Sequence, residues 1–65
     1  MTDIVVPPEL TRALIDAGLE DEFLEISPDH QREYAEWVDA ADQSAERTTR
    51  TAAVIAELAE RVGES

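Results

Sequence analysis

The sequence predicts an all-α domain, a small compact bundle of three main helices plus one short helix or helical turn. Apolar residues recur at spacings of three and four along most of the chain, and prolines and glycines stand where helices would begin and end. The 65 residues suffice for one domain with a small core. We expect a single domain over residues 1–65, with an N-terminal tail at 1–6, the bundle at 7–62 and a C-terminal tail at 63–65.

The first helix is predicted to open at Pro7 and Pro8, because proline lacks an N–H and has a fixed φ, both of which suit a first turn. Glu9 complements the positive end of the helix dipole there. Gly18 is a natural stop, so the helix should end beside it. Apolar residues between these ends recur at helical spacing, at Leu10, Ala13, Leu14 and Ala17.

A short acidic helix or helical turn is predicted over residues 19–26. Its apolar residues Leu19, Phe23 and Ile26 are four and three residues apart, which is helical spacing. This segment should therefore bring Phe23 into the core.

The third helix has the clearest start. Ser27 suits the N-cap, Pro28 the first helical position and Asp29 the positive helix end. The helix should run to about Asp42. One of its faces carries residues at helical spacing, namely His30, Tyr34, Trp37, Val38 and Ala41.

Tyr34 and Trp37 are three residues apart on that face, and we interpret them as its core anchors. Each is large enough to dominate a small core while its polar tip reaches an edge. On this interpretation Trp37→Ala costs about 3–5 kcal/mol and unfolds the domain. The alternative places Trp37 on a binding surface, and the variant would then melt close to the wild type.

The last helix is the longest predicted element. Ser44 is well placed to cap it, Glu46 lies in its first turn, and Gly63 should end it. Short loops make the helices antiparallel neighbours. An apolar stripe left over on this helix could equally form a dimer, so the oligomeric state stays open. The stripe is drawn from Thr48, Thr51, Ala52, Ile55, Leu58, Ala59 and Val62.

The chain is strongly acidic, with 16 aspartates and glutamates, five arginines and no lysine, for a formal net charge of −11. Such a charge repels phosphate backbones and anionic lipids, so it disfavours nucleic acids and membrane surfaces as partners. A cationic partner is the electrostatic expectation, and a solubility or halophilic adaptation is the alternative. No apolar run approaches the length that spans a bilayer, and the start does not resemble a signal peptide. We therefore expect a cytoplasmic protein without membrane insertion.

No catalytic, cofactor or metal site is predicted, and we expect that the protein is not an enzyme. His30 is the only histidine and is interpreted as a packing or capping side chain, because catalysis or metal binding would need further groups nearby. The acidic run at 20–22 lacks the alternating ligands and the glycine of a calcium loop. Cysteines and phosphate-binding glycine loops are also missing. A small hydrolase is a remote alternative, since no nucleophile and base stand at a recognisable spacing.

The five arginines are of two kinds. Four have an acid three or four residues away, as in the pair of Glu46 and Arg50. Arg47 has none, so we expect it to bind a carboxylate of another helix, with Asp39 and Asp42 as candidates across the turn. Recognition of a carboxylate on a partner is the alternative for Arg47.

A series of short motifs follows one order along the chain. A phenylalanine, a Ser-Pro-x-His step, a Glu-Tyr, a tryptophan and an Arg-x-x-Arg stand at Phe23, Ser27, Pro28, His30, Glu33, Tyr34, Trp37, Arg47 and Arg50. The opening adds Val6, Pro7, Leu10, Ala13 and Leu14. This series resembles the pattern of the bacteriocin-protection, or YdeI/OmpD-associated, family. Asp42 and Glu46 depart from it, since the family tends to have lysine and threonine there.

The resemblance implies a small, all-helical bacterial domain, often appended to another domain and linked to protection against bacteriocins or cationic antimicrobial peptides, with no established catalytic residue. We therefore expect a non-enzymatic interaction module, the helical module alone, with a protein or cationic peptide as its partner in peptide resistance or envelope stress. Tyr34, Trp37, Arg47 and Arg50 are the possible partner-binding residues. The alternative function is an acidic nucleic-acid mimic that binds a basic protein.

Overall fold

The computed structural model describes residues 6–64, and over that part of the chain it contains helices and no strand. The helices are α1 (Pro8–Ala17), α2 (Glu20–Glu25), α3 (Pro28–Asp39) and α4 (Ser44–Glu64). The predicted all-α fold of three main helices plus a short one is confirmed. None of the described helices is long and apolar enough to cross a membrane.

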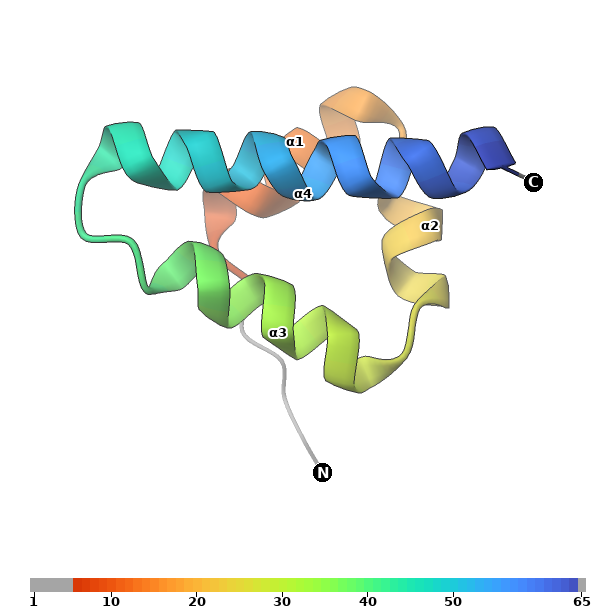
Figure 1. Ribbon diagram of the computed structural model, residues 1–65, viewed down its shortest axis with the longest axis horizontal. Coiled ribbons are helices and arrows are strands. Elements are labelled where there is room, and N and C mark those ends of the chain that lie inside the picture. The colour runs from red at the N-terminus through yellow and green to blue at the C-terminus, as the bar shows by residue number, and fades with distance from the viewer. Residues whose placement is uncertain (1–5, 65) are drawn as a thin grey trace.

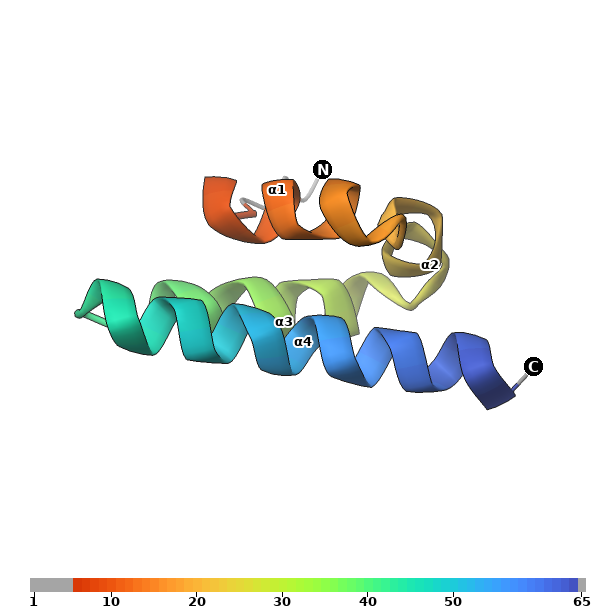
Figure 2. The ribbon, with the colours of Figure 1, turned by 90° about the horizontal axis from the view of Figure 1, so that it is seen from above.

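The helices are arranged around α4, which contacts each of the other three. α3 and α4 lie side by side and antiparallel, joined by a short loop at one end (Figure 1). α1 packs against α4 on one side of this pair, and α2 leads from the end of α1 to the start of α3 (Figure 2). The α3/α4 pair therefore keeps one long side that α1 does not cover.

The predicted helix boundaries at Gly18 and Ser27 are confirmed. Gly18 has φ 70° and ψ 29°, a left-handed conformation that favours glycine, and its N–H donates to the carbonyl of Ile15 at 3.1 Å. Ser27 is the N-cap of α3, where its hydroxyl accepts the backbone N–H of His30 at 3.3 Å. Pro28 is the first residue of that helix, as expected.

The boundaries of α3 and α4 differ from the prediction at three points. α3 ends at Asp39 and not near Asp42. Ser44 is the first helical residue of α4 and not its cap, because the N–H of Arg47 donates to the carbonyl of Gln43 at 2.9 Å. α4 also continues through Gly63, which has no positive φ and lies in an exposed last turn, where glycine weakens a helix without stopping it.

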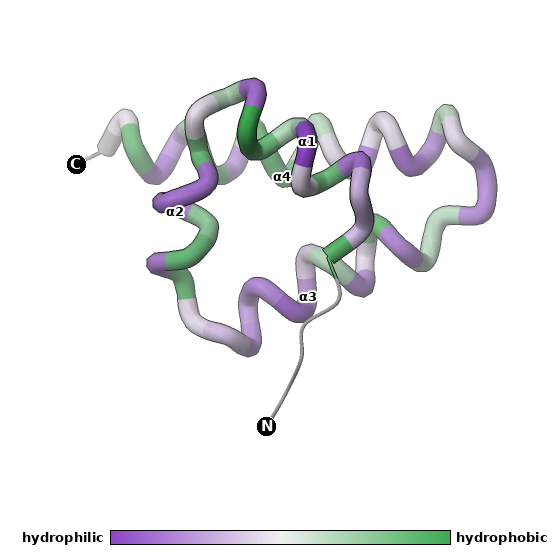
Figure 3. Tube along the Cα trace, turned by 180° about the vertical axis from the view of Figure 1, so that it is seen from behind, coloured by the Kyte–Doolittle hydropathy of each residue, from purple (hydrophilic) through white to green (hydrophobic). Residues whose placement is uncertain are grey.

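The core collects apolar side chains from all the helices. Phe23 is 4 % exposed, as its predicted role requires. Val54 is fully buried although the predicted face of α4 omitted it, whereas Ala52 and Ala59 of that face are exposed. Figure 3 shows hydrophobic and hydrophilic stretches alternating along each helix, which is the pattern that buries one side. The core cluster consists of Leu10, Leu14, Leu19, Phe23, Ile26, Val38, Val54 and Leu58.

The interpretation of Trp37 as a core anchor is wrong. Its side chain is 42 % exposed, whereas Ala35 is 2 % exposed and Val38 is fully buried. The helix thus turns Ala35 and Val38 toward the core, which leaves the indole at the edge of the helix. Tyr34 is half-buried and packs against the core cluster, while His30, placed on the same predicted face, is exposed.

Candidate functional site

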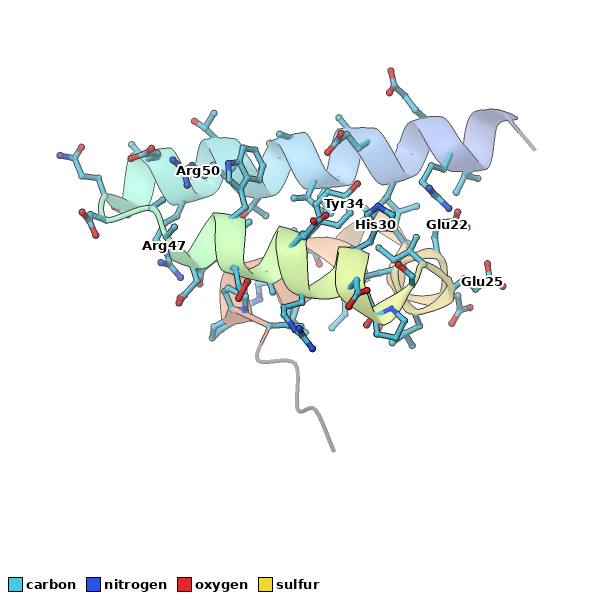
Figure 4. All side chains as sticks on the ribbon, turned by 60° about the horizontal axis from the view of Figure 1, so that its bottom comes forward. Glu22, Glu25, His30, Tyr34, Arg47 and Arg50 are labelled. Atoms are coloured by element: carbon cyan, nitrogen blue, oxygen red, sulfur yellow. The ribbon has the colours of Figure 1, made fainter. Side chains whose placement is uncertain are left out.

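Side chains of α3 and α4 form a shallow groove on the side of the helix pair away from α1. Glu33, Tyr34 and Trp37 of α3 and Glu57 of α4 line it, with a volume of about 450 Å³. We call these four residues the α3/α4 groove. Figure 4 shows Tyr34 reaching from α3 toward α4, with Arg50 further along the same helix pair. Two of the predicted partner-binding residues, Tyr34 and Trp37, therefore line one surface feature.

The helical spacing of α3 explains this arrangement. Tyr34 and Trp37 are three residues apart, so they lie on one side of the helix, while Ala35 and Val38 turn into the core. Glu33 is four residues before Trp37 and shares its edge. The groove therefore has an aromatic floor and a carboxylate from each helix.

Arg50 lies over the indole of Trp37. Its guanidinium carbon is 5.3 Å from the ring centroid, close enough for a cation–π attraction. Nη1 donates to the backbone carbonyl of Trp37 and Nη2 donates to Glu46, each at 2.7 Å. The predicted i,i+4 pair of Glu46 and Arg50 is confirmed. Arg50 thus packs against the indole at the end of the groove.

The two glutamates of the groove act on the Tyr34 hydroxyl. Burial raises the pKa of the Tyr34 hydroxyl most, and the negative charge of Glu57 raises it next. The charge of Arg61 lowers this pKa, while the charge of Glu33 and a hydrogen bond to Glu57 raise it by smaller amounts. Tyr34 therefore stays neutral at physiological pH, and its hydroxyl donates to the Glu57 carboxylate. Aromatic faces beside carboxylates favour a cation, because both the ring quadrupole and the anion attract positive charge.

Arg47 has a different environment, at the corner where α1, α3 and α4 meet. It donates to the Glu9 carboxylate of α1, to the carbonyls of Asp39 and Ala41 at 3.1 Å each, and to the Asp39 carboxylate at 3.4 Å. The predicted bond to Asp39 across the turn is confirmed, whereas Asp42, the other candidate, does not take part in these bonds. We call Arg47, Glu9 and Asp39 the Arg47 corner.

The partners at this corner shift one another's pKa values. A backbone hydrogen bond and then the Arg47 guanidinium lower the pKa of the Glu9 carboxyl below its ordinary value. The hydrogen bond to Glu9 raises the pKa of Arg47. Glu9 was not predicted as the partner of Arg47, because it precedes Arg47 by 38 residues and no helical spacing rule reaches that far. All the polar contacts of Arg47 described here hold the chain to itself, so it contributes to the fold at this corner.

The remaining candidate residues do not converge on a chemical centre. Nδ1 of His30 is 3.0 Å from the Ser27 hydroxyl, which agrees with a capping role. Arg61 lies 3.7 Å from Glu22 of α2, a bond across helices in place of the local pair expected on α4. Among residues 6–64 no group of three or more histidine, aspartate or glutamate side chains could hold a metal ion.

A wider groove of about 600 Å³ separates α1 from α4. Alanines form much of its floor, no aromatic side chain lines it, and Arg12 stands between its acids Glu9 and Asp16. Glu9 is already bound to Arg47, and the groove has no aromatic side chain that would add contact area to its charged residues. The α3/α4 groove is therefore the stronger candidate.

The fold is that of a small helical domain with a groove of two aromatic and two acidic side chains on one surface. The chain matches the family described as "Bacteriocin-protection, YdeI or OmpD-Associated" over residues 3–61, and it belongs to that family. The resemblance inferred from the motifs is confirmed. No curated protein and no solved structure matches the chain.

Proposed function

We propose that the protein is a non-enzymatic interaction module that binds a cationic protein or peptide through the α3/α4 groove. The observation that carries this proposal is the aromatic floor of Tyr34 and Trp37 between the carboxylates of Glu33 and Glu57. No ion pair joins either glutamate to an arginine within the described residues 6–64. Glu57 accepts a hydrogen bond from the Tyr34 hydroxyl, and neither carboxylate is neutralised by an arginine of the chain, so both charges can attract a cation from outside.

The charge of the chain supports the same conclusion. A net charge of −11 attracts cationic partners over long range and repels anionic ones. Exposed aromatic side chains supply the contact area that charge alone does not, and tyrosine and tryptophan are the commonest residues to carry binding energy in interfaces. Trp37 is exposed although its burial would stabilise so small a domain, which is the pattern of a recognition residue.

In the setting of its family, we propose that this binding serves protection against bacteriocins or other cationic peptides. Membership of the bacteriocin-protection family supports the role, and the acidic groove supplies a physical means of holding such a peptide. We place the protein in the cytoplasm in this proposal, where capture of a basic peptide or protein would act by sequestration.

Binding can be followed through the emission of Trp37, the single tryptophan of the chain. The probe is a peptide in which arginine and lysine alternate with serine, titrated at low salt and at roughly 0.5 M salt, where screening shortens the Debye length to a few ångström. We expect saturable binding at low salt that weakens by at least about tenfold at high salt.

A pair of matched variants locates the binding. Glu33→Gln/Glu57→Gln removes two charges from the groove, and Glu25→Gln/Glu60→Gln removes two exposed charges outside it. We expect the first variant to weaken binding several-fold more than the second. Equal losses would show that general charge, not the groove, attracts the peptide. Displacement of a basic DNA-binding protein from DNA by both variants alike would instead support an acidic nucleic-acid mimic.

A further inference from the structure

We infer that the α3/α4 groove recognises an arginine side chain of its partner in preference to a lysine. This inference rests on the proposed function and specifies the chemistry of its ligand. It is carried by the contacts that Arg50 makes with Trp37 beside the groove and by the two helices that supply the carboxylates of the groove.

Arg50 provides the precedent within the same surface. Its guanidinium carbon lies over the Trp37 ring, 5.3 Å from the ring centroid, while two of its nitrogens donate at 2.7 Å to the Trp37 carbonyl and the Glu46 carboxylate. A guanidinium can do both at once because its plane faces the ring and its five N–H groups point outward in a fixed fork. Trp37 therefore already binds this chemical group.

The groove beside Arg50 offers the same combination to a second guanidinium. Tyr34 and the exposed part of Trp37 form its floor, and acceptors stand on both sides, with Glu33 on α3 and Glu57 on α4. Two carboxylates on different helices suit a guanidinium, whose five donors point outward in one plane and can reach two acceptors while its flat face contacts an aromatic ring. An ammonium is more strongly hydrated and gains less from a flat aromatic surface.

The cations of the chain itself leave the groove open. Arg50 stands at one end, where Glu46 and the Trp37 carbonyl hold its donors. Arg61 stands toward the other end, where it pairs with Glu22 at 3.7 Å and acts on Tyr34 through its charge. Neither arginine lines the groove, whose volume is about 450 Å³. The space between them is bordered by carboxylates and fits one more cationic side chain.

Two peptides test the inference, one with arginine at every second position and one with lysine in the same places, the rest being serine. Calorimetric titration at low salt is expected to give an affinity at least about fivefold higher for the arginine peptide, since guanidinium stacking and bidentate contacts add to equal charge. We expect this ratio to fall close to one in Glu33→Gln/Glu57→Gln and to persist in Glu25→Gln/Glu60→Gln. Circular dichroism melts of both variants check that the fold is kept.

The outcomes separate the arginine preference from the proposed function. Equal affinities for the two peptides, both weakened by the groove variant, would overturn arginine selectivity and leave the proposed function in place. A preference for arginine that persists in the groove variant would also overturn the inference, because the selectivity would then arise elsewhere. Binding of neither peptide, or binding indifferent to the groove variant, would overturn the proposed function itself.

Discussion

Arg47 and Arg50 lie one turn apart on α4, and their side chains are equally exposed at 25 %. Arg47 joins three segments of the chain, because it binds Glu9 of α1, Asp39 of α3 and the carbonyl of Ala41 in the loop. Arg50 contacts one neighbouring helix through Trp37 and one residue of its own helix, Glu46. Exposure alone therefore does not distinguish an arginine that maintains the fold from one that shapes a surface.

The partners of each arginine make this distinction. The bond between Arg47 and Glu9 spans 38 residues and connects the first helix to the last, so its loss affects the packing of α1. The bonds of Arg50 span 13 and four residues and lie within the α3/α4 pair. We therefore expect changes at the Arg47 corner to appear as lost stability, and changes beside the α3/α4 groove to appear as altered binding.

The largest effect is expected for Arg47→Met, which keeps much of the side-chain volume and removes every donor. The carboxylate of Glu9 and the carbonyls of Asp39 and Ala41 lose a cationic partner at the point where three segments meet. Thermal denaturation should show a melting temperature several degrees below that of the wild type. Peptide binding at a temperature where the variant is folded should be unchanged, and a stable variant with lost binding would reverse the roles assigned to the two arginines.

Trp37→Ala is expected to cost about 1–2 kcal/mol, less than the 3–5 kcal/mol of a buried aromatic, because the indole is already 42 % exposed. Chemical denaturation measures the difference. Phe23→Ala serves as the buried reference, because Phe23 is 4 % exposed. This variant should lose about 3–5 kcal/mol of stability. Equal losses in the two variants would restore Trp37 to the core, and peptide titration of the folded Trp37→Ala protein should show weakened binding.

The boundaries of the fold could be predicted where one residue decides the local backbone. Gly18 adopts a left-handed φ at the end of α1, and Ser27 and Pro28 start α3. In both cases the residues that decide the helix boundary lie within a few positions of it. The orientation of α3 could not be predicted in this way. Apolar side chains fill two overlapping faces of that helix, and only packing against α4 decides that Val38 turns inward and Trp37 does not.

The candidate site was predictable to a similar extent. The aromatic pair on α3 and the need of Arg47 for a distant carboxylate follow from spacing on single helices. Glu57 joins the groove from α4, and Glu9 joins the Arg47 corner from α1, through contacts that only the assembled bundle creates. Helical periodicity identifies which residues share a face, but it does not say which faces of different helices meet.

The pH dependence of stability tests the electrostatic part of the Arg47 corner. The pKa of Glu9 is lowered from its ordinary 4.5, so the ionised form is favoured by folding. Its contribution is complete above that ordinary value and is lost as the pH falls through the lower value of the folded state. The difference in unfolding free energy between wild type and Glu9→Gln should therefore be constant above about pH 5.5 and shrink in more acidic solution.

The control for this experiment is Glu25→Gln, which removes one exposed negative charge from α2 and reports the general relief of repulsion in so acidic a chain. Urea denaturation between about pH 3 and pH 7 measures the difference in unfolding free energy between wild type and each of these two variants. A difference in unfolding free energy between wild type and Glu9→Gln that does not change with pH would mean that the Glu9 side chain acts through packing and not through its charge.

Arg50→Gln should have the smallest effect on stability, about 1 kcal/mol or less, because it removes one surface ion pair and one cation–π contact. Binding of the arginine peptide should instead tighten by about twofold, since a positive charge leaves the end of an anionic groove. Calorimetry at low salt measures the change in affinity, and high salt should remove this change.

The matched control is Arg12→Gln, on α1 beside the other groove. It removes the same charge at a site away from Trp37 and should tighten binding less. If Arg50→Gln weakened binding, the guanidinium would be part of the binding surface, either as a contact to the partner or as a support for the indole. Arg50 would then act in binding, whereas Arg47 acts in stability.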